Sequence, residues 1–330
     1  MEKKNSKIQL TYNTQFAPLS YDFVYSLAIC RAVAEKMDIN KKIDVLLINS
    51  AFREVGIESD YSEEYRRNKF NDVILTCAQN CNWIDSFLIS KADRFFNVRD
   101  GILNIPAEDA VQKRKEGIPE WILTPMVPKH LEAVLKSGGN ISEYGFSPTN
   151  RALEYCEKIL KPGKFVAFHP RVSVHSKERN TPLDKWSEIA LRLKKDNDLE
   201  TVLIPDPEDY KSDFIWRDFP GTVLNDSALS FEIKLAASTM AEMNIVWVGG
   251  AMTPLHFADV RLLAFGPLNS NNSIQNKAFY DRKGPDFEKQ PLYFHPEKQF
   301  LDWAPDTALT VEYMLKVINT RLSIRATSAN

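Results

Sequence analysis

A cluster of cationic side chains follows a short apolar run in the second half of the chain. Arg171, Lys177 and Arg179 all lie within residues 169–180, directly after the apolar run Phe165–Phe168. An arginine fork matches phosphate oxygens with two parallel hydrogen bonds, and a lysine supplies a point charge. A solvated basic loop has the same composition, but its place at a predicted strand end favours diphosphate binding.

A glycine pair follows a second apolar run, Asn244–Val248. Glycines let a backbone approach a ligand closely, and the free N–H groups at a helix start attract anions. An ordinary turn between a strand and a helix has the same residues. We expect Thr253 to cap the following helix or to contact a phosphate oxygen, and His256 to face either a ligand or the core. The candidate diphosphate contacts here are Gly249, Gly250, Met252 and Thr253.

A third loop begins after the apolar run Thr201–Ile204. Its acidic residues resemble a metal-binding motif, although such a turn is more often solvated. Together with the basic loop and the short helix, it supplies candidates for the neighbourhood of a nucleotide or sugar: Asn180, Pro205, Asp206 and His256.

These loops require a sheet whose strands end at one edge. Apolar runs near residues 165, 201, 222, 245 and 262 alternate with helical segments, a pattern that predicts a doubly wound parallel sheet. In such a sheet, ligands bind beyond the carboxyl ends of the strands. The first half begins with a strand, a helix and a strand at residues 8–48, which predicts a second parallel sheet. There we also predict a strand at residues 72–76, a helix near residues 83–90, and a helix at residues 128–136.

The segments 169–180 and 182–186 resemble the donor domain of heptosyltransferase-like GT-B glycosyltransferases. In that family a basic or hydroxyl loop precedes a helix with a Pro-Leu-x-x-Trp signature, here Pro182 to Trp186. The stretch from Val248 to His256, followed by a strand ending in Phe-Gly-Pro, resembles the family's segment that meets the sugar nucleotide. The family pattern has an acid and a hydroxyl where this chain has Gly249 and Gly250. A second resemblance, to uncharacterised bacterial glycosyltransferase-like proteins, rests on residues 18–23 and 302–306.

The resemblance implies an α/β fold of two Rossmann-like domains facing a central cleft, as in GT-B proteins. Residues 1–148 would bind the acceptor and residues 149–330 the donor, with the last helix packing back on the first domain. The implied activity is metal-independent and cofactor-free transfer of a sugar from a nucleotide-diphosphate sugar to a glycan or lipid-linked acceptor, as in polysaccharide biosynthesis. Arg171, Lys177 and Arg179 would stabilise the leaving diphosphate. Asp22, which starts the first helix, would be the base, although a carboxylate there also favours the helix dipole.

Composition limits the alternatives. The 42 basic and 44 acidic residues give a net charge of −2, which does not suggest a nucleic-acid partner. Four cysteines in 330 residues do not form a disulfide scaffold, and no signal peptide or 18-residue apolar span is visible. We therefore expect a cytoplasmic protein, with peripheral membrane contact left open. A nucleotide-sugar epimerase on the same fold and a non-catalytic binding protein are the alternative interpretations.

Overall fold

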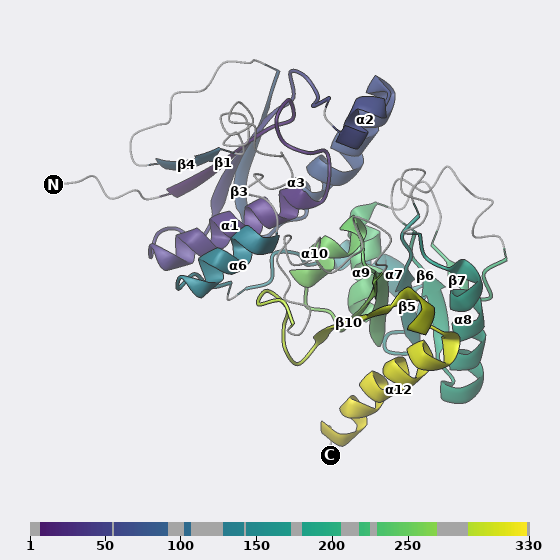
Figure 1. Ribbon diagram of the computed structural model, residues 1–330. Helices are drawn as coiled ribbons and strands as arrows, with labels where there is room; N and C mark the ends of the chain where they lie inside the picture. The colour runs from purple at the N-terminus through teal and green to yellow at the C-terminus, as the bar shows by residue number, and fades with distance from the viewer. Residues whose placement is uncertain are drawn as a thin grey trace. The chain divides into compact units, whose positions relative to one another are not determined.

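The computed structural model describes residues 7–54, 56–91, 102–106, 128–141, 143–172, 180–205, 218–224, 230–268 and 290–328. These residues form two compact units, the first within Met1–Gly145 and Asp281–Tyr293, the second within Phe146–Tyr280 and Phe294–Asn330. Each unit has its own parallel sheet with helices packed on it (Figure 1). The predicted α/β class with two Rossmann-like domains is therefore confirmed. The domain boundary was predicted after residue 148, with residues 149–330 in the second domain.

The first unit has a four-stranded sheet in the order β3-β2-β1-β4, and all its strands are parallel. The strands are β1 (Lys7–Asn13), β2 (Ile43–Ile48), β3 (Ile84–Ser90) and β4 (Ile102–Pro106). Helix α1 (Asp22–Lys36) packs on β1 and β2, and α6 (Pro128–Lys136) lies beside α1 (Figure 1). The βαβ unit predicted at residues 8–48 is confirmed.

Two predictions in the first unit were wrong. Residues 72–76, predicted as a strand, lie in a continuous helical segment made of α2 (Glu63–Lys69), the π-helix η2 (Phe70–Leu75) and α3 (Thr76–Gln79). The predicted helix near residues 83–90 is strand β3. A short apolar run does not distinguish a buried helix from a strand, and β3 is an edge strand whose residues 85–89 are all exposed. Such a strand lacks the alternation by which strands are recognised.

The second unit has a six-stranded parallel sheet in the order β10-β9-β8-β5-β6-β7. The strands are β5 (Phe165–His169), β6 (Glu200–Leu203), β7 (Thr222–Val223), β8 (Met243–Trp247), β9 (Leu262–Leu268) and β10 (Gln299–Pro305). The helices that cover it are α7 (Asn150–Glu157), α8 (Leu183–Asn197), α9 (Phe231–Met240) and α12 (Val311–Ser328). The doubly wound sheet is confirmed.

Alternate side chains of β5 enter separate cores on the two faces of this sheet. Val166 and Phe168 pack with α8 and α12, while Phe165 and Ala167 pack with α7 and α9. Full burial of each large apolar side chain contributes about 1.5–3 kcal/mol, so both faces stabilise the unit. The buried residues of α12 belong to the second unit's core. The expected packing of this helix on the first domain stays a prediction.

The two C-terminal motifs singled out in the sequence meet across β9 and β10. Trp303 pairs in register with Gly266, and a Cβ on Gly266 would lie 2.0 Å from the ring carbon Cε3 of Trp303. A side chain at position 266 is therefore incompatible with this ring position. In the described part of the chain, no helix is both long and apolar enough to cross a bilayer.

Candidate functional site

The topological switch point of the second sheet lies between β5 and β8. The chain runs outward from β5 to β6 and β7, then returns to place β8 on the other side of β5. The loops that leave neighbouring strands here diverge, which opens a crevice at the carboxyl edge. The residues that follow β5 and β8 are therefore the primary candidates for ligand contacts in this unit.

Arg171, two residues beyond β5, packs against Gly249, two residues beyond β8. A Cβ added to Gly249 would lie 2.9 Å from Cδ and 3.2 Å from Cγ of Arg171, so the arginine stem occupies the space of a side chain at 249. Gly249 has extended backbone angles that any residue adopts, so its role here is steric. Arg171 Nη1 donates to Asn180 Oδ1 at 2.9 Å, which orients the guanidinium.

Thr181 closes the loop that carries Arg171. The Arg171 N–H donates to Thr181 Oγ1 at 2.7 Å, and the Thr181 N–H donates to the Arg171 carbonyl at 2.9 Å. The N-cap residue of α8 is the next residue, Pro182, which makes no side-chain cap bond. Within this loop the candidates Lys177 and Arg179 lie outside the described residues, as does Asp206 in the loop after β6.

A buried histidine and a buried lysine underlie this edge. His169 Nε2 lies 2.9 Å from Asn244 Oδ1, and the Asn244 amide donates to the carbonyls of Ser238 and Arg261, so Nε2 of His169 is the donor. Burial lowers the pKa of His169 to about 4, an effect that the nearby Lys234 reinforces and the Asn244 hydrogen bond opposes. His169 is thus neutral at pH 7.

Lys234, on α9, donates from Nζ to the carbonyl of Pro205 at 2.6 Å. It is a buried cation next to the candidate Pro205, just beyond the end of β6. Sequence reasoning missed it, because a lysine within a helix ordinarily faces solvent and no motif marks this one.

The segment after Gly249 forms two short helices. Gly250–Met252 is a 3₁₀ turn (η5) and Thr253–His256 is one α-helical turn (α10), with Met252 as the N-cap residue. Thr253, the first residue of α10, is buried and does not take the capping position. His256 packs against Phe294 with ring centroids 4.6 Å apart, and burial lowers its pKa to about 3. The structure thus brings Arg171, Asn180 and Gly249 together, and places Thr253 and His256 in the interior.

In the first unit, Asp22 is the first residue of α1 and is half-buried. Ser20 Oγ donates to Asp22 Oδ2 at 3.0 Å, and the Asp22 N–H donates to Ser20 Oγ at 3.3 Å. This reciprocal pair holds the carboxylate at the end of the loop that follows β1. A carboxylate so placed can accept a proton from a hydroxyl group and also interacts favourably with the helix N-terminus.

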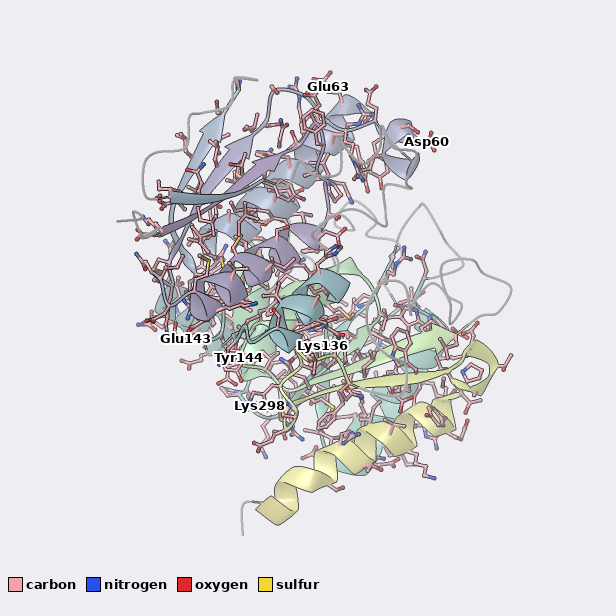
Figure 2. The ribbon with its side chains drawn as sticks, turned by 60° about the vertical axis from the view of Figure 1, so that its left-hand side comes forward. Asp60, Glu63, Lys136, Glu143, Tyr144 and Lys298 are labelled. Atoms are coloured by element: carbon pink, nitrogen blue, oxygen red, sulfur yellow. The ribbon has the colours of Figure 1, made fainter. Side chains whose placement is uncertain are left out.

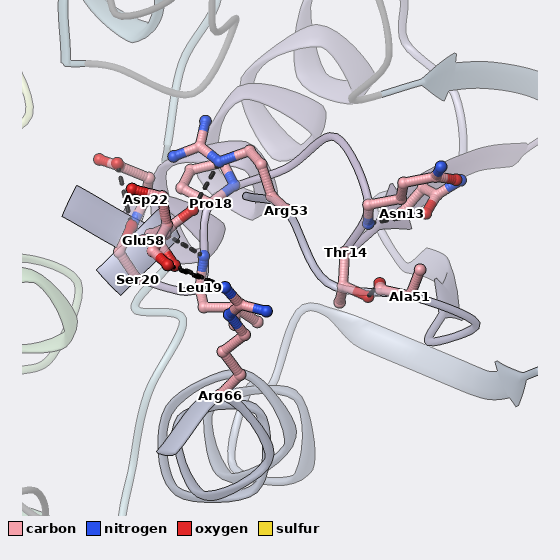
Figure 3. A network of polar contacts seen from close by, with 12 residues as sticks. Asn13, Thr14, Pro18, Leu19, Ser20, Asp22, Ala51, Arg53, Glu58 and Arg66 are labelled. Atoms are coloured by element: carbon pink, nitrogen blue, oxygen red, sulfur yellow. Dashed lines mark hydrogen bonds and ion pairs between the residues drawn. The ribbon is translucent and has the colours of Figure 1, made fainter. Parts of the chain in front are cut away.

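The loop before Asp22 is fastened by a buried carboxylate (Figure 3). Glu58 accepts the Leu19 N–H at 3.0 Å and Arg53 Nε at 2.6 Å. Arg66, on α2, donates to the Glu58 carbonyl at 2.9 Å. Sequence reasoning missed Glu58, because it lies in a charged stretch that shows no periodicity and predicts only a surface segment.

A cavity of about 1090 Å³ opens at the carboxyl edge of the first sheet. Residues that follow β1, β2 and β3 line it together with α2 and the start of η2; π-helical turns are frequent at functional sites. Its walls combine amide, aromatic and charged side chains, including Asn49, Asn71, Phe16, Phe52, Arg67, Lys91 and Glu54. Amides bond hydroxyl groups, and aromatic faces accept apolar ring surfaces.

Among the described residues, no group of three or more His, Cys, Asp or Glu side chains is placed to hold a metal ion. No protein-family model matches the chain, and a search of curated proteins finds no matching relative.

Solved structures with the same fold are found over the whole chain. A family 9 glycosyl transferase from Veillonella parvula DSM 2008 is similar over 98% of this chain and 98% of its own, with a TM-score of 0.58 and 11% identity. The E. coli ADP-heptose LPS heptosyltransferase II is similar over 97% of this chain and 99% of its own, with a TM-score of 0.53 and 11% identity. At the level of the fold, these structures confirm the resemblance to heptosyltransferase-like GT-B glycosyltransferases.

Proposed function

We propose that this protein is a glycosyltransferase that moves a sugar from a nucleotide-diphosphate sugar to a glycan or lipid-linked acceptor. The observation that carries the proposal is the pairing of two loops at the switch point of the second sheet. Arg171 packs on Gly249 and is oriented by Asn180, so a guanidinium is held at the edge where this fold binds ligands. The fold shared with two transferases of this kind supports the same conclusion.

In the proposed reaction, the acceptor hydroxyl oxygen attacks the anomeric carbon of the donor sugar. Asp22 takes the hydroxyl proton, and the bond between the sugar and the diphosphate breaks with its electron pair leaving on the diphosphate. Arg171, joined by Lys177 and Arg179 from the same loop, would compensate that charge without a metal ion. Loss of one such stabilising group typically lowers kcat by about 10²–10³, and loss of a general base by about 10²–10⁴.

We assign the acceptor to the cavity of the first unit. Asn49 and Asn71 offer hydrogen bonds to sugar hydroxyls, and Phe16 and Phe52 offer faces on which a sugar ring can stack. This combination of amides and aromatic rings suits a glycan better than a purely apolar ligand. Lys91, which also lines the cavity, adds a positive charge for an anionic substituent.

Thermal denaturation with UDP, GDP, ADP, CDP or TDP, with magnesium and with EDTA, tests the donor site. A ligand at 100 times its Kd stabilises the native state by about 2.7 kcal/mol, which corresponds to a rise in Tm of roughly 5–10 °C for a unit of this size. We expect one nucleotide to raise Tm equally with and without magnesium, and Arg171→Met to abolish the rise. Arg192→Met, on the surface of α8, is the matched control.

The outcomes separate the alternatives. A rise in Tm that persists in Arg171→Met contradicts the assigned donor site, and no rise with any nucleotide favours a non-catalytic protein. Conversion of the matching nucleotide sugar to its epimer without an acceptor identifies an epimerase. Transfer to an added glycan, followed by mass spectrometry of the product, identifies the transferase.

A further inference from the structure

We infer that Glu58 is a positioning residue that holds the loop before Asp22 in its active geometry; the catalytic part of this inference rests on the proposed function. Glu58 lies in the 3₁₀ turn η1 (Gly56–Asp60), which follows β2, whereas Asp22 follows β1. The carboxylate of Glu58 is buried, and it bonds the backbone of the loop rather than a ligand. Its action on chemistry would therefore be indirect.

Three consecutive residues of the loop are each fixed by a separate hydrogen bond. Tyr12 donates from its hydroxyl to the Pro18 carbonyl at 2.5 Å. The Leu19 N–H donates to Glu58, and Ser20 exchanges two bonds with Asp22. Of these bonds, the one from Leu19 joins the loop to the turn after β2. The start of the loop is joined to the same segment by Thr14, whose hydroxyl donates to the Ala51 carbonyl at 2.6 Å and whose carbonyl accepts the Arg53 N–H at 2.8 Å.

The far side of Glu58 is itself anchored. Arg53 binds the carboxylate through Nε at 2.6 Å, and both side chains are largely shielded from solvent. Arg66 donates to the Glu58 carbonyl and forms an ion pair with Glu54 at 2.8 Å. Since Arg66 and Glu54 both line the cavity, Glu58 connects a wall of the proposed acceptor pocket to the loop that ends in Asp22 (Figure 3).

A charged acceptor in this position is stronger than a neutral one, and its loss leaves a buried N–H without a partner. The Leu19 N–H is the donor at risk, because Leu19 is fully buried. The loop around it should then open more often, and Asp22 should spend less time in the geometry that accepts a proton.

Matched variants separate the hydrogen bond from the volume of the side chain. Glu58→Met keeps the length of the side chain and removes both acceptors, whereas Glu58→Gln keeps one oxygen for the Leu19 N–H. Asp60→Asn changes an exposed carboxylate of the same turn and is the control (Figure 2). Arg53→Met removes the ion pair and leaves the Leu19 acceptor in place.

Hydrogen–deuterium exchange of the peptide 14–22 is the first readout, because it does not depend on activity. We expect Glu58→Met to accelerate exchange there about tenfold or more, Glu58→Gln by less, and Asp60→Asn not at all. Exchange in β2, the buried central strand of the same unit, reports unfolding of that unit and should stay unchanged. If Glu58→Met exchanges like the wild type in this peptide, or accelerates equally in β2, the positioning role is wrong.

The second readout is turnover of the nucleotide sugar whose nucleotide is the one found in the thermal screen, with water or glycan as acceptor. Glu58→Met should lower kcat tenfold or more with the donor KM unchanged, and should shift the acidic limb of the kcat–pH profile; Glu58→Gln should recover most of kcat. A uniform loss at all pH values that scales with the folded fraction would contradict positioning. If the wild type turns over no nucleotide sugar, the proposed function fails, and the exchange result still decides the role of Glu58.

Discussion

The contact between Gly249 and Arg171 predicts that Gly249→Ala changes the free energy of unfolding in a direction that depends on whether Arg171 is present. In Gly249→Ala, the new Cβ would stand 2.9 Å from Arg171 Cδ and 3.2 Å from Cγ, so the arginine stem must move. A side chain pushed off its rotamer costs about 0.5–1.5 kcal/mol. The move also weakens the 2.9 Å bond to Asn180, and hydrogen bonds to charged groups contribute about 1.5–3 kcal/mol when fully formed.

Alanine at 249 also has a stabilising effect on the folded protein, because it reduces the conformational entropy of the unfolded chain. Replacing glycine by alanine at a compatible backbone position contributes about 0.4–1 kcal/mol, and position 249 is extended and so compatible. In the Arg171→Ala background, the nearest remaining atom of residue 171 is Cβ at 3.5 Å, an ordinary contact. There Gly249→Ala should stabilise by about 0.4–1 kcal/mol, whereas in the wild type it should destabilise by roughly 0.5–1.5 kcal/mol.

The double-mutant cycle measures this sign reversal directly. Urea unfolding of the four proteins should give a coupling free energy of about 1–2 kcal/mol, within the range for residues in contact. Nucleotide-induced stabilisation should also decrease in Gly249→Ala, because the guanidinium is displaced. If Gly249→Ala has the same effect in both backgrounds, Arg171 does not pack on Gly249, and the donor site assigned to these two loops must be abandoned.

Two further predictions concern single groups. Asp22→Asn should lower kcat by about 10²–10⁴ in a steady-state assay while nucleotides still raise Tm as in the wild type, because amide and carboxylate share a shape but only the carboxylate accepts a proton; unchanged kcat excludes Asp22 as the base. His169 and His256 have pKa values of about 4 and about 3, below the usual 6.5, so the unfolded chain binds more protons and stability falls as pH drops from 6.5 toward 3. Between pH 7 and pH 5 each should cost roughly 2 kcal/mol, and His256→Phe should remove its share of that loss in urea unfolding.

The strands that were located from the sequence are those whose apolar run is flanked by proline or glycine, which end regular structure. The strand at residues 201–204 is followed by Pro205, and β5 is preceded by Pro162 and Gly163, so both were located. Strand β10 was missed, because Gln299–Pro305 mixes apolar with polar residues and lies at the sheet edge. Edge strands are identified by their neighbours, and a pairing such as that of Trp303 with Gly266 joins residues far apart in the chain.

The residues of the candidate site also differ in whether the sequence alone could identify them. Arg171 could be selected from the sequence because its position after a strand gives it a place at the sheet edge. Glu58 and Lys234 could not be selected in this way. Each is a buried charge that is stabilised by a hydrogen bond to a backbone group of another loop. The local sequence pattern predicts that such charged side chains are exposed. They can be buried because residues far away in the sequence supply their hydrogen-bond partners.

The position of the Arg171 side chain requires that residue 249 has no side chain. The family pattern has an acidic side chain and a hydroxyl where this chain has Gly249 and Gly250, and in this structure the stem of Arg171 fills the space that a side chain at 249 would need. An acid at 249 would therefore displace the arginine from its bond with Asn180. Glycine in place of an acid at 249 removes one negative charge from this edge, where the guanidinium of Arg171 remains. Under the proposed function, an edge without that acid suits the anionic diphosphate of the donor better than its sugar hydroxyls.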